Sequence, residues 1–127
     1  MSIVLLPDPL PTLIENVQQL LLTLEPAGGV WYGVNTTEPP VYPYIVHTRI
    51  VSTANATLQG PSDLQNTRVQ VDVVARTIAE ADALQKRLAD LMATWSVANV
   101  PLSSVDLYEE AVKAWRISSD WSIWATT

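Results

Sequence analysis

The chain contains no cysteine and a single histidine, His47, among its 127 residues. Without thiols it has no disulfide, no iron–sulfur cluster, no thiolate metal site and no cysteine nucleophile. One histidine also excludes a multi-histidine metal site. Phenylalanine is absent too, so the aromatic side chains are five Trp and four Tyr. These absences exclude thiol chemistry and most kinds of metal site.

Positive charge is scarce as well. Seven Lys and Arg stand against 13 Asp and Glu, which gives a net charge of -6. An acidic protein repels the phosphate backbone, which argues against nucleic-acid binding through a basic face. The most apolar stretch, residues 13–24, is interrupted by polar side chains and is too short to span a bilayer. The N-terminus lacks the basic region of a targeting signal, so we expect synthesis in the cytoplasm and no membrane partner.

Sequence motifs for catalysis are also missing. There is no G-x-S-x-G turn, and Ala27-Gly28-Gly29 lacks the spacing and the lysine of a phosphate loop. Glu109 and Glu110 are adjacent, so on a strand they would face opposite sides. His47 falls within an alternating strand pattern, which favours a structural or interfacial role. The sequence therefore predicts no enzymatic activity, no bound metal and no cofactor.

Helical periodicity predicts two amphipathic helices, each opened by a T-x-x-E capping box. The first is expected over residues 12–24, and the second begins at Thr77. Leu22 projects from the polar side of the first helix, where it is either a tolerated exposed leucine or a contact with another subunit. The apolar stripe of the second helix consists of Ala81, Leu84, Leu88, Leu91, Met92 and Trp95.

Alternating apolar residues predict strands over residues 44–53, 67–76 and 114–125, with a shorter one over 102–108. The length and the 48% hydrophobic content predict one packed domain over residues 1–127. The order of helix, strands, helix and strands predicts an α+β fold. In it, an antiparallel β-sheet has two amphipathic helices packed on one face.

Residues 54–66 have the composition of a long loop between two strands, with Gly60-Pro61-Ser62-Asp63 as the turn signal. The segment contains Leu58 and Leu64, which a solvated loop does not need. Loops of this length in small domains more often carry a function than serve only as a connection. We therefore expect this loop to order on assembly.

Several blocks of the sequence resemble the small tail completion, or tail terminator, proteins of long-tailed bacteriophages. The similarity extends from the first helix to the end of the chain, and the linker over residues 34–41 departs from it. The Arg-x-Gln-Val-Asp strand followed by a helix is the most informative part. The blocks are Pro43-Tyr44-Ile45-Val46, the strand from Arg68 to Ala75, the helix from Thr77, and the closing strand from Trp115 to Trp124.

This resemblance implies a structural virion protein. Such proteins form a ring, typically of six subunits, at the head-proximal end of the tail tube. The ring stops tube growth and joins the neck, so the implied partners are further copies of the chain, the tail tube protein and neck or connector proteins. DNA would pass through the lumen without specific binding, and the ring would be assembled in the host cytoplasm.

A surplus of Trp and Tyr suits interfaces, because these side chains combine a large apolar body with a polar tip. The candidate interface residues are Leu22, Trp31, Tyr32, Tyr42, Leu58, Leu64 and Trp124. Three alternatives remain open at the level of sequence. They are another phage neck or head–tail connector protein, a small hydrolase or ligand-binding domain, and a cytoplasmic adaptor that binds a peptide by strand addition.

Overall fold

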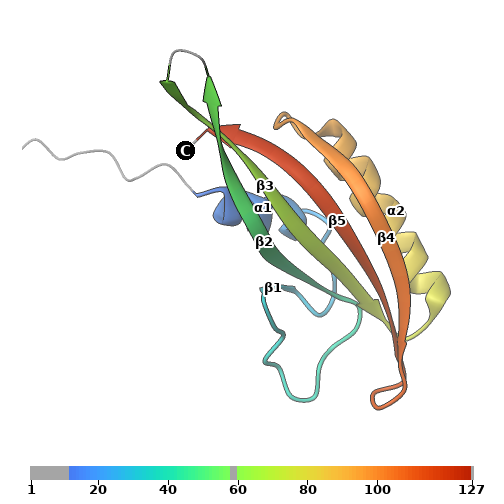
Figure 1. Ribbon diagram of the computed structural model, residues 1–127. Helices are drawn as coiled ribbons and strands as arrows, with labels where there is room; N and C mark the ends of the chain where they lie inside the picture. The colour runs from blue at the N-terminus through green and yellow to red at the C-terminus, as the bar shows by residue number, and fades with distance from the viewer. Residues whose placement is uncertain (1–11, 58–59, 127) are drawn as a thin grey trace, which may run out of the picture.

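The computed structural model describes residues 12–57 and 60–126, with backbone alone for residues 53–57, 60–64 and 126. It forms a twisted sheet with two helices behind it (Figure 1). The elements are α1 (Leu13–Leu22), β1 (Val30–Tyr32), β2 (Tyr44–Thr57), β3 (Gly60–Ala75), α2 (Ile78–Thr94), β4 (Asn99–Glu109) and β5 (Ala114–Thr126).

The five strands lie in the order β1-β2-β3-β5-β4. All neighbours are antiparallel except β1, whose three residues run parallel to β2. Both helices cover the same face of the sheet (Figure 1). The predicted α+β fold, an antiparallel sheet with two amphipathic helices on one face, is therefore confirmed.

The main core lies between the helices and the sheet. Alternate residues of β3 and β5 point towards the helices because side chains alternate across a strand. Val73 and Ile123 are fully buried there, as are Leu21 of α1 and Leu88 of α2. The predicted stripe of α2 supplies Ala81, Leu84, Leu88 and Met92 to this core, with Leu91 and Trp95 packed at its margin.

The threonine half of both predicted capping boxes is present. The hydroxyl of Thr12 accepts a hydrogen bond from the backbone N–H of Glu15 at 3.2 Å. Thr77 accepts one in the same way from Glu80 at 3.1 Å. Each cap satisfies one backbone donor that the first turn of a helix would otherwise leave unpaired.

The prediction of a long loop over residues 54–66 is wrong. β2 extends to Thr57 and β3 begins at Gly60, and their backbones are paired, with Ala54 opposite Gln65 and Thr57 opposite Gly60. On its other side β3 pairs with β5 as far as Leu64, which lies opposite Thr126. The Gly-Pro-Ser-Asp turn signal misled because these residues open β3. Pro61 lies opposite Ala56, beside the register shift between Ala54 and Ala56, where a proline is tolerated.

A small second cluster lies on the helix-free face, between the sheet and the segment that joins β1 to β2. It consists of Tyr44, Val46, Val74 and Ala114, with Trp31 and Tyr42 packed against it. Gly28 allows the joining segment to approach closely, because a Cβ at this position would lie 1.8 Å from the carbonyl oxygen of Val41. The segment therefore covers one end of the sheet on this face.

Candidate assembly surface

Among the elements whose side chains the structure describes, the edge strand β4 exposes the most large apolar residues. All residues from Val100 to Tyr108 are exposed, and Val105 keeps 54% of its surface. β5 pairs with one side of β4, and no described strand pairs with its other side. Pro101 and a register shift between Pro101 and Ser103 interrupt the first part of this edge. From Ser104 to Glu109 the pairing is regular, which leaves a straight row of backbone donors and acceptors open to a partner.

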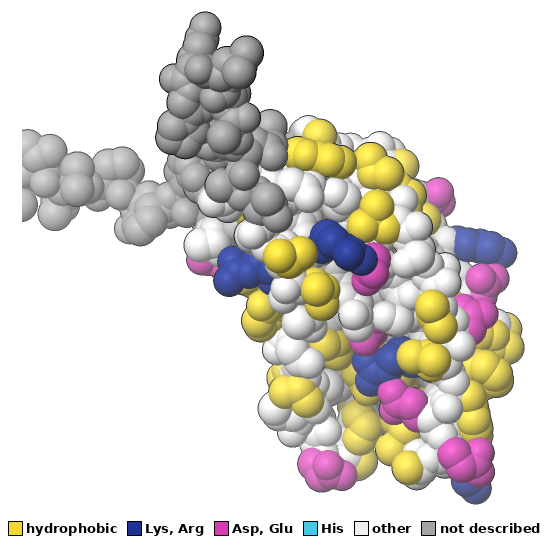
Figure 2. Space-filling model, viewed as in Figure 1, with side chains coloured by type: hydrophobic (Ala, Val, Ile, Leu, Met, Phe, Trp, Pro, Cys, Tyr) yellow, Lys and Arg dark blue, Asp and Glu magenta, His cyan; other side chains and the backbone are white. Residues whose placement is uncertain are grey.

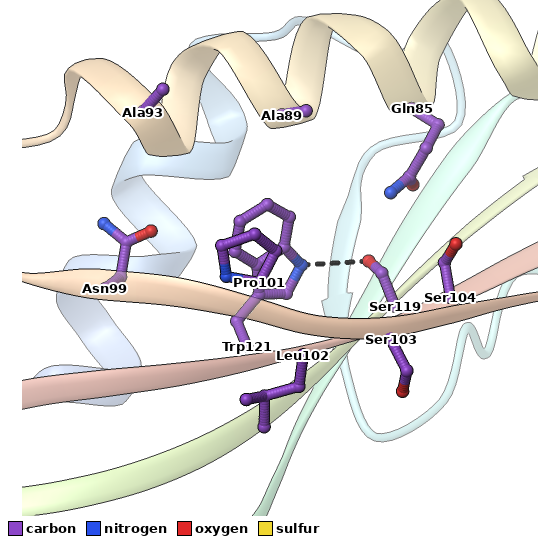
Figure 3. Close-up of a pocket in the computed structure, with 10 residues that line it drawn as sticks. All are labelled: Gln85, Ala89, Ala93, Asn99, Pro101, Leu102, Ser103, Ser104, Ser119 and Trp121. Atoms are coloured by element: carbon purple, nitrogen blue, oxygen red, sulfur yellow. Dashed lines mark hydrogen bonds between the residues drawn. The ribbon is translucent and has the colours of Figure 1, made fainter.

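A groove of about 580 Å³ runs between α2 and β4. Ala89 and Ala93 line it from the helix, and Figure 3 shows Trp121 between the helix and β4. The Trp121 indole N–H donates to Ser119 Oγ at 2.9 Å. None of the ten residues drawn carries a charge, so the groove suits an apolar side chain and offers no general acid or base.

The opposite edge of the sheet is also open over part of its length. β1 pairs with β2 only from Ile45 to His47. Beyond that point, no strand in the described part of the chain pairs with the outer side of β2. Ile50 and Val51 are about half exposed there, at 51% and 47%. The sheet therefore ends in two unpaired edges that face away from each other.

The helix-free face between these edges carries compensated charge. Arg116 binds Asp72 and Glu109, each at 2.6 Å, and Arg68 binds Asp120 at 2.9 Å. Burial alone would lower the pKa of Arg116, but the hydrogen bonds to Glu109 and Asp72 raise it above its ordinary value. Figure 2, which views this face, shows basic and acidic side chains adjacent to one another between scattered apolar ones.

The aromatic candidates do not gather into one patch. Trp31 and Tyr42 are half-buried in the small cluster, where the Trp31 indole N–H donates to the Gly28 carbonyl at 2.8 Å. The Arg76 guanidinium lies 4.4 Å from the centre of the Tyr42 ring. Tyr32 points to the other face of β1, where its ring meets that of His47 edge-on. Trp31 and Tyr42 therefore have local packing partners within the chain.

The remaining candidates are distributed over the surface. Leu22 is 40% exposed on α1, as its position on the polar side predicts, and Trp124 is half-buried on β5. Leu64 lies in β3, and its side chain is outside the described part. Leu58 lies outside the described residues altogether. An interface role for all of these residues stays a prediction.

His47 has a structural environment. Its side chain is 1% exposed, and its Nε2–H donates to Gln18 Oε1 at 2.5 Å. Gln18 in turn donates to the carbonyl of Val30 at 2.9 Å, which fixes the orientation of its amide. Burial lowers the pKa of His47 to about 4, so the ring is neutral at neutral pH. It therefore joins α1 to the sheet as a neutral hydrogen-bond donor.

This histidine predicts a pH-dependent stability. In the unfolded chain it titrates near its ordinary value of 6.5, so between about pH 6.5 and 4 the unfolded state binds more protons. The contribution of His47 to the free energy of unfolding is complete above about pH 6.5. We expect the free energy of unfolding to fall by about 2–3 kcal/mol as the pH falls to 4. Urea titrations at both values would measure this. His47→Asn should flatten the slope, and an unchanged slope would contradict the assignment.

The apolar character of β4 was not among the predicted site features. The pattern over residues 102–108 indicated a short strand, and the signal was Val105 and Leu107, two apolar residues that alternate with Ser104 and Asp106. An alternating strand usually buries one face. Here Val105 and Leu107 lie opposite Ser118 and Arg116 on the helix-free face of the sheet, so that both remain at the surface.

Two further properties bear on function. Across the described ranges, His, Asp and Glu form no group of three or more that could hold a metal ion. In the same ranges, no helix has the length and hydropathy needed to cross a membrane.

The fold and its surface define a small α+β protein whose available contacts are open sheet edges rather than a polar pocket. The family model for tail completion protein gp17 matches residues 22–126, so the chain belongs to that family. It is a structural component of a bacteriophage tail. This confirms the resemblance inferred from the strand and helix blocks.

A solved structure supports the fold. A chain in the virion of a native gene transfer agent particle superposes with a TM-score of 0.58 at 14% identity, and the match covers 84% of each chain. A comparison with curated proteins returned no match.

Proposed function

We propose that this chain forms a ring, of six subunits, at the head-proximal end of the tail tube, where it stops tube growth and joins the neck. Support comes first from membership of the tail completion family. The second support is the pair of open edges at opposite ends of one sheet. A closed ring requires two different surfaces on each subunit, so that every copy offers one to each neighbour.

In this role the chain is not an enzyme. The groove beside α2 is lined by neutral side chains, and His47 is buried in a hydrogen bond that holds α1 to the sheet. The contacts that matter are those with further copies, with the tube protein and with neck proteins. The paired charges of the helix-free face would present little net charge to passing DNA.

The test is tail length in particles assembled without the protein. Deletion of its gene should give tails of irregular length that do not join heads, and expression from a plasmid should restore both properties. A terminator is expected to control length, whereas a neck protein is not. Tails of normal length that merely fail to join heads would contradict the proposal and favour a connector.

A further inference from the structure

We propose that copies of this chain join head to tail through their sheet edges, an inference that rests on the proposed ring. The edge of β4 in one subunit, over residues 104–107, pairs with the open edge of β2, over residues 48–52, in the next. Tyr108 and Glu109 then turn away from β2, because β1 already pairs with its residues 45–47. The occupant of each edge is therefore a second copy of this chain. The pairing extends the sheet from one subunit into its neighbour.

Strand direction supports this junction. From β2 through β3 and β5 to β4 there are three antiparallel steps, so β2 and β4 run in opposite directions. Rotation about a ring axis that lies roughly along the strands preserves the direction of each strand. The β4 strand of one subunit and the β2 strand of the next would therefore meet antiparallel, like the main pairs within the sheet. The helices of all subunits would lie on the same side.

Charge complementarity supports it independently. Arg49 is the only Lys or Arg in β2, and Asp106 is the only acidic residue in β4 before Glu109. Neither takes part in an ion pair among the residues that the structure describes. Both belong to the helix-bearing face, because Arg49 lies opposite the buried Val69 and Asp106 lies opposite the buried Ile117.

The apolar residues match on the other face. Val51 lies opposite Arg68, and Val105 lies opposite Ser118, so both belong to the helix-free face. When Arg49 is placed opposite Asp106, the register shift in β2 between Arg49 and Val51 brings Val51 opposite Val105. Cross-strand pairs of opposite charge and of β-branched residues both stabilise antiparallel strands. One junction would thus gain an ion pair on one face and an apolar pair on the other.

The register gives the strands a tilt. Following the partners across the sheet, Arg49 lies level with Pro101, and Asp106 lies level with Ile45. Joining Arg49 to Asp106 therefore offsets neighbouring subunits by four residues of β2, which is about 13 Å. Each repeat of four strands is about 19 Å wide. The resulting tilt of ~35° agrees with the tilt that closed barrels require.

The absence of native cysteine makes the junction testable by cross-linking. Directly opposed residues of an antiparallel pair are close enough for a disulfide. Val51→Cys and Val105→Cys would each be made alone, and the two variants would be co-expressed and oxidised after isolation. We expect the mixture to give disulfide-linked dimers and each variant alone to give none. A chain that carries both changes should give a series of disulfide-linked oligomers, the largest of which is the closed covalent ring.

The control pairs Val105→Cys with Ala83→Cys, which is exposed on α2 and belongs to neither edge. This mixture should not cross-link. Efficient cross-linking of Val105→Cys with itself would overturn the proposal, because it would mean that β4 pairs with another β4. Rings visible by electron microscopy without the Val51–Val105 cross-link would overturn the junction and leave the proposed ring intact.

Charge reversal supplies a second measurement. Arg49→Asp alone and Asp106→Arg alone should each weaken self-association by about tenfold, and the double variant should recover it. Equal weakening by the double and single variants would overturn the pairing of these two residues. A chain that stays monomeric, forms no rings and still gives normal tails would contradict both the junction and the proposed function.

Discussion

Leu88→Ala is expected to lower the free energy of unfolding by about 2–5 kcal/mol. Leu88 is fully buried at the centre of the α2 stripe, where the helix meets the sheet. The truncation would lose the favourable free energy of transferring the leucine side chain from water to the core. It would also leave a cavity that a close-packed interior fills only in part. A denaturant titration followed by tryptophan fluorescence would measure the loss as a shift of the midpoint.

Asp82→Ala is the matched control on the opposite face of the same helix. Asp82 is exposed and forms an ion pair with Lys86 at 3.1 Å, one turn further along. Exposed pairs of this spacing contribute about 0.3–0.5 kcal/mol. If Asp82→Ala cost more than Leu88→Ala, the assignment of the two faces of α2 would be wrong.

Arg116→Met is expected to cost about 3 kcal/mol, the second large effect. The change removes the partner of Asp72, whose side chain is only 10% exposed, and leaves a carboxylate in a poorly hydrated place. Glu109 loses the same partner, but it is 37% exposed and can be rehydrated. Most of the expected loss therefore comes from Asp72, and the same titration would measure it.

Two companion variants separate this effect from a general loss of surface charge. Arg68→Met breaks the more exposed pair with Asp120 on the same face and should cost less than about 1 kcal/mol. Adding Asp72→Asn to Arg116→Met should recover part of the stability, because the unpaired negative charge of Asp72 is then absent. If Arg68→Met cost as much as Arg116→Met, burial of Asp72 would not be the cause.

Local patterns predicted much of the fold. The capping boxes at Thr12 and Thr77 located both helix starts, because the signal and its hydrogen bond lie within four residues. Strand alternation located the main strands for the same reason. What the sequence did not reveal was that β2 continues to Thr57 and that β3 begins at Gly60. Leu64 to Asn66 pair with residues of β5 that lie far away in the chain, and no local pattern marks such partners.

The candidate assembly surface was harder to predict. Trp31 and Tyr42 stood out as surplus aromatics, yet their packing partners come from a segment that folds back against Gly28. Such a contact leaves no periodic trace in the sequence. Whether Val105 is covered depends on which face of the sheet the helices pack against, which alternation alone does not determine. Membership of the family could be inferred from the blocks because it needs no knowledge of that order.

The position of β5 has a consequence during synthesis. This strand is the last in the chain, yet it lies between β3 and β4. Its partners in β3 are distant, from Ala75 with Trp115 to Leu64 with Thr126. Until residues 114–126 leave the ribosome, the apolar strand β3 has an uncovered side, and β4 has no neighbour. A premature stop before Ala114 should therefore yield insoluble protein rather than a smaller folded one.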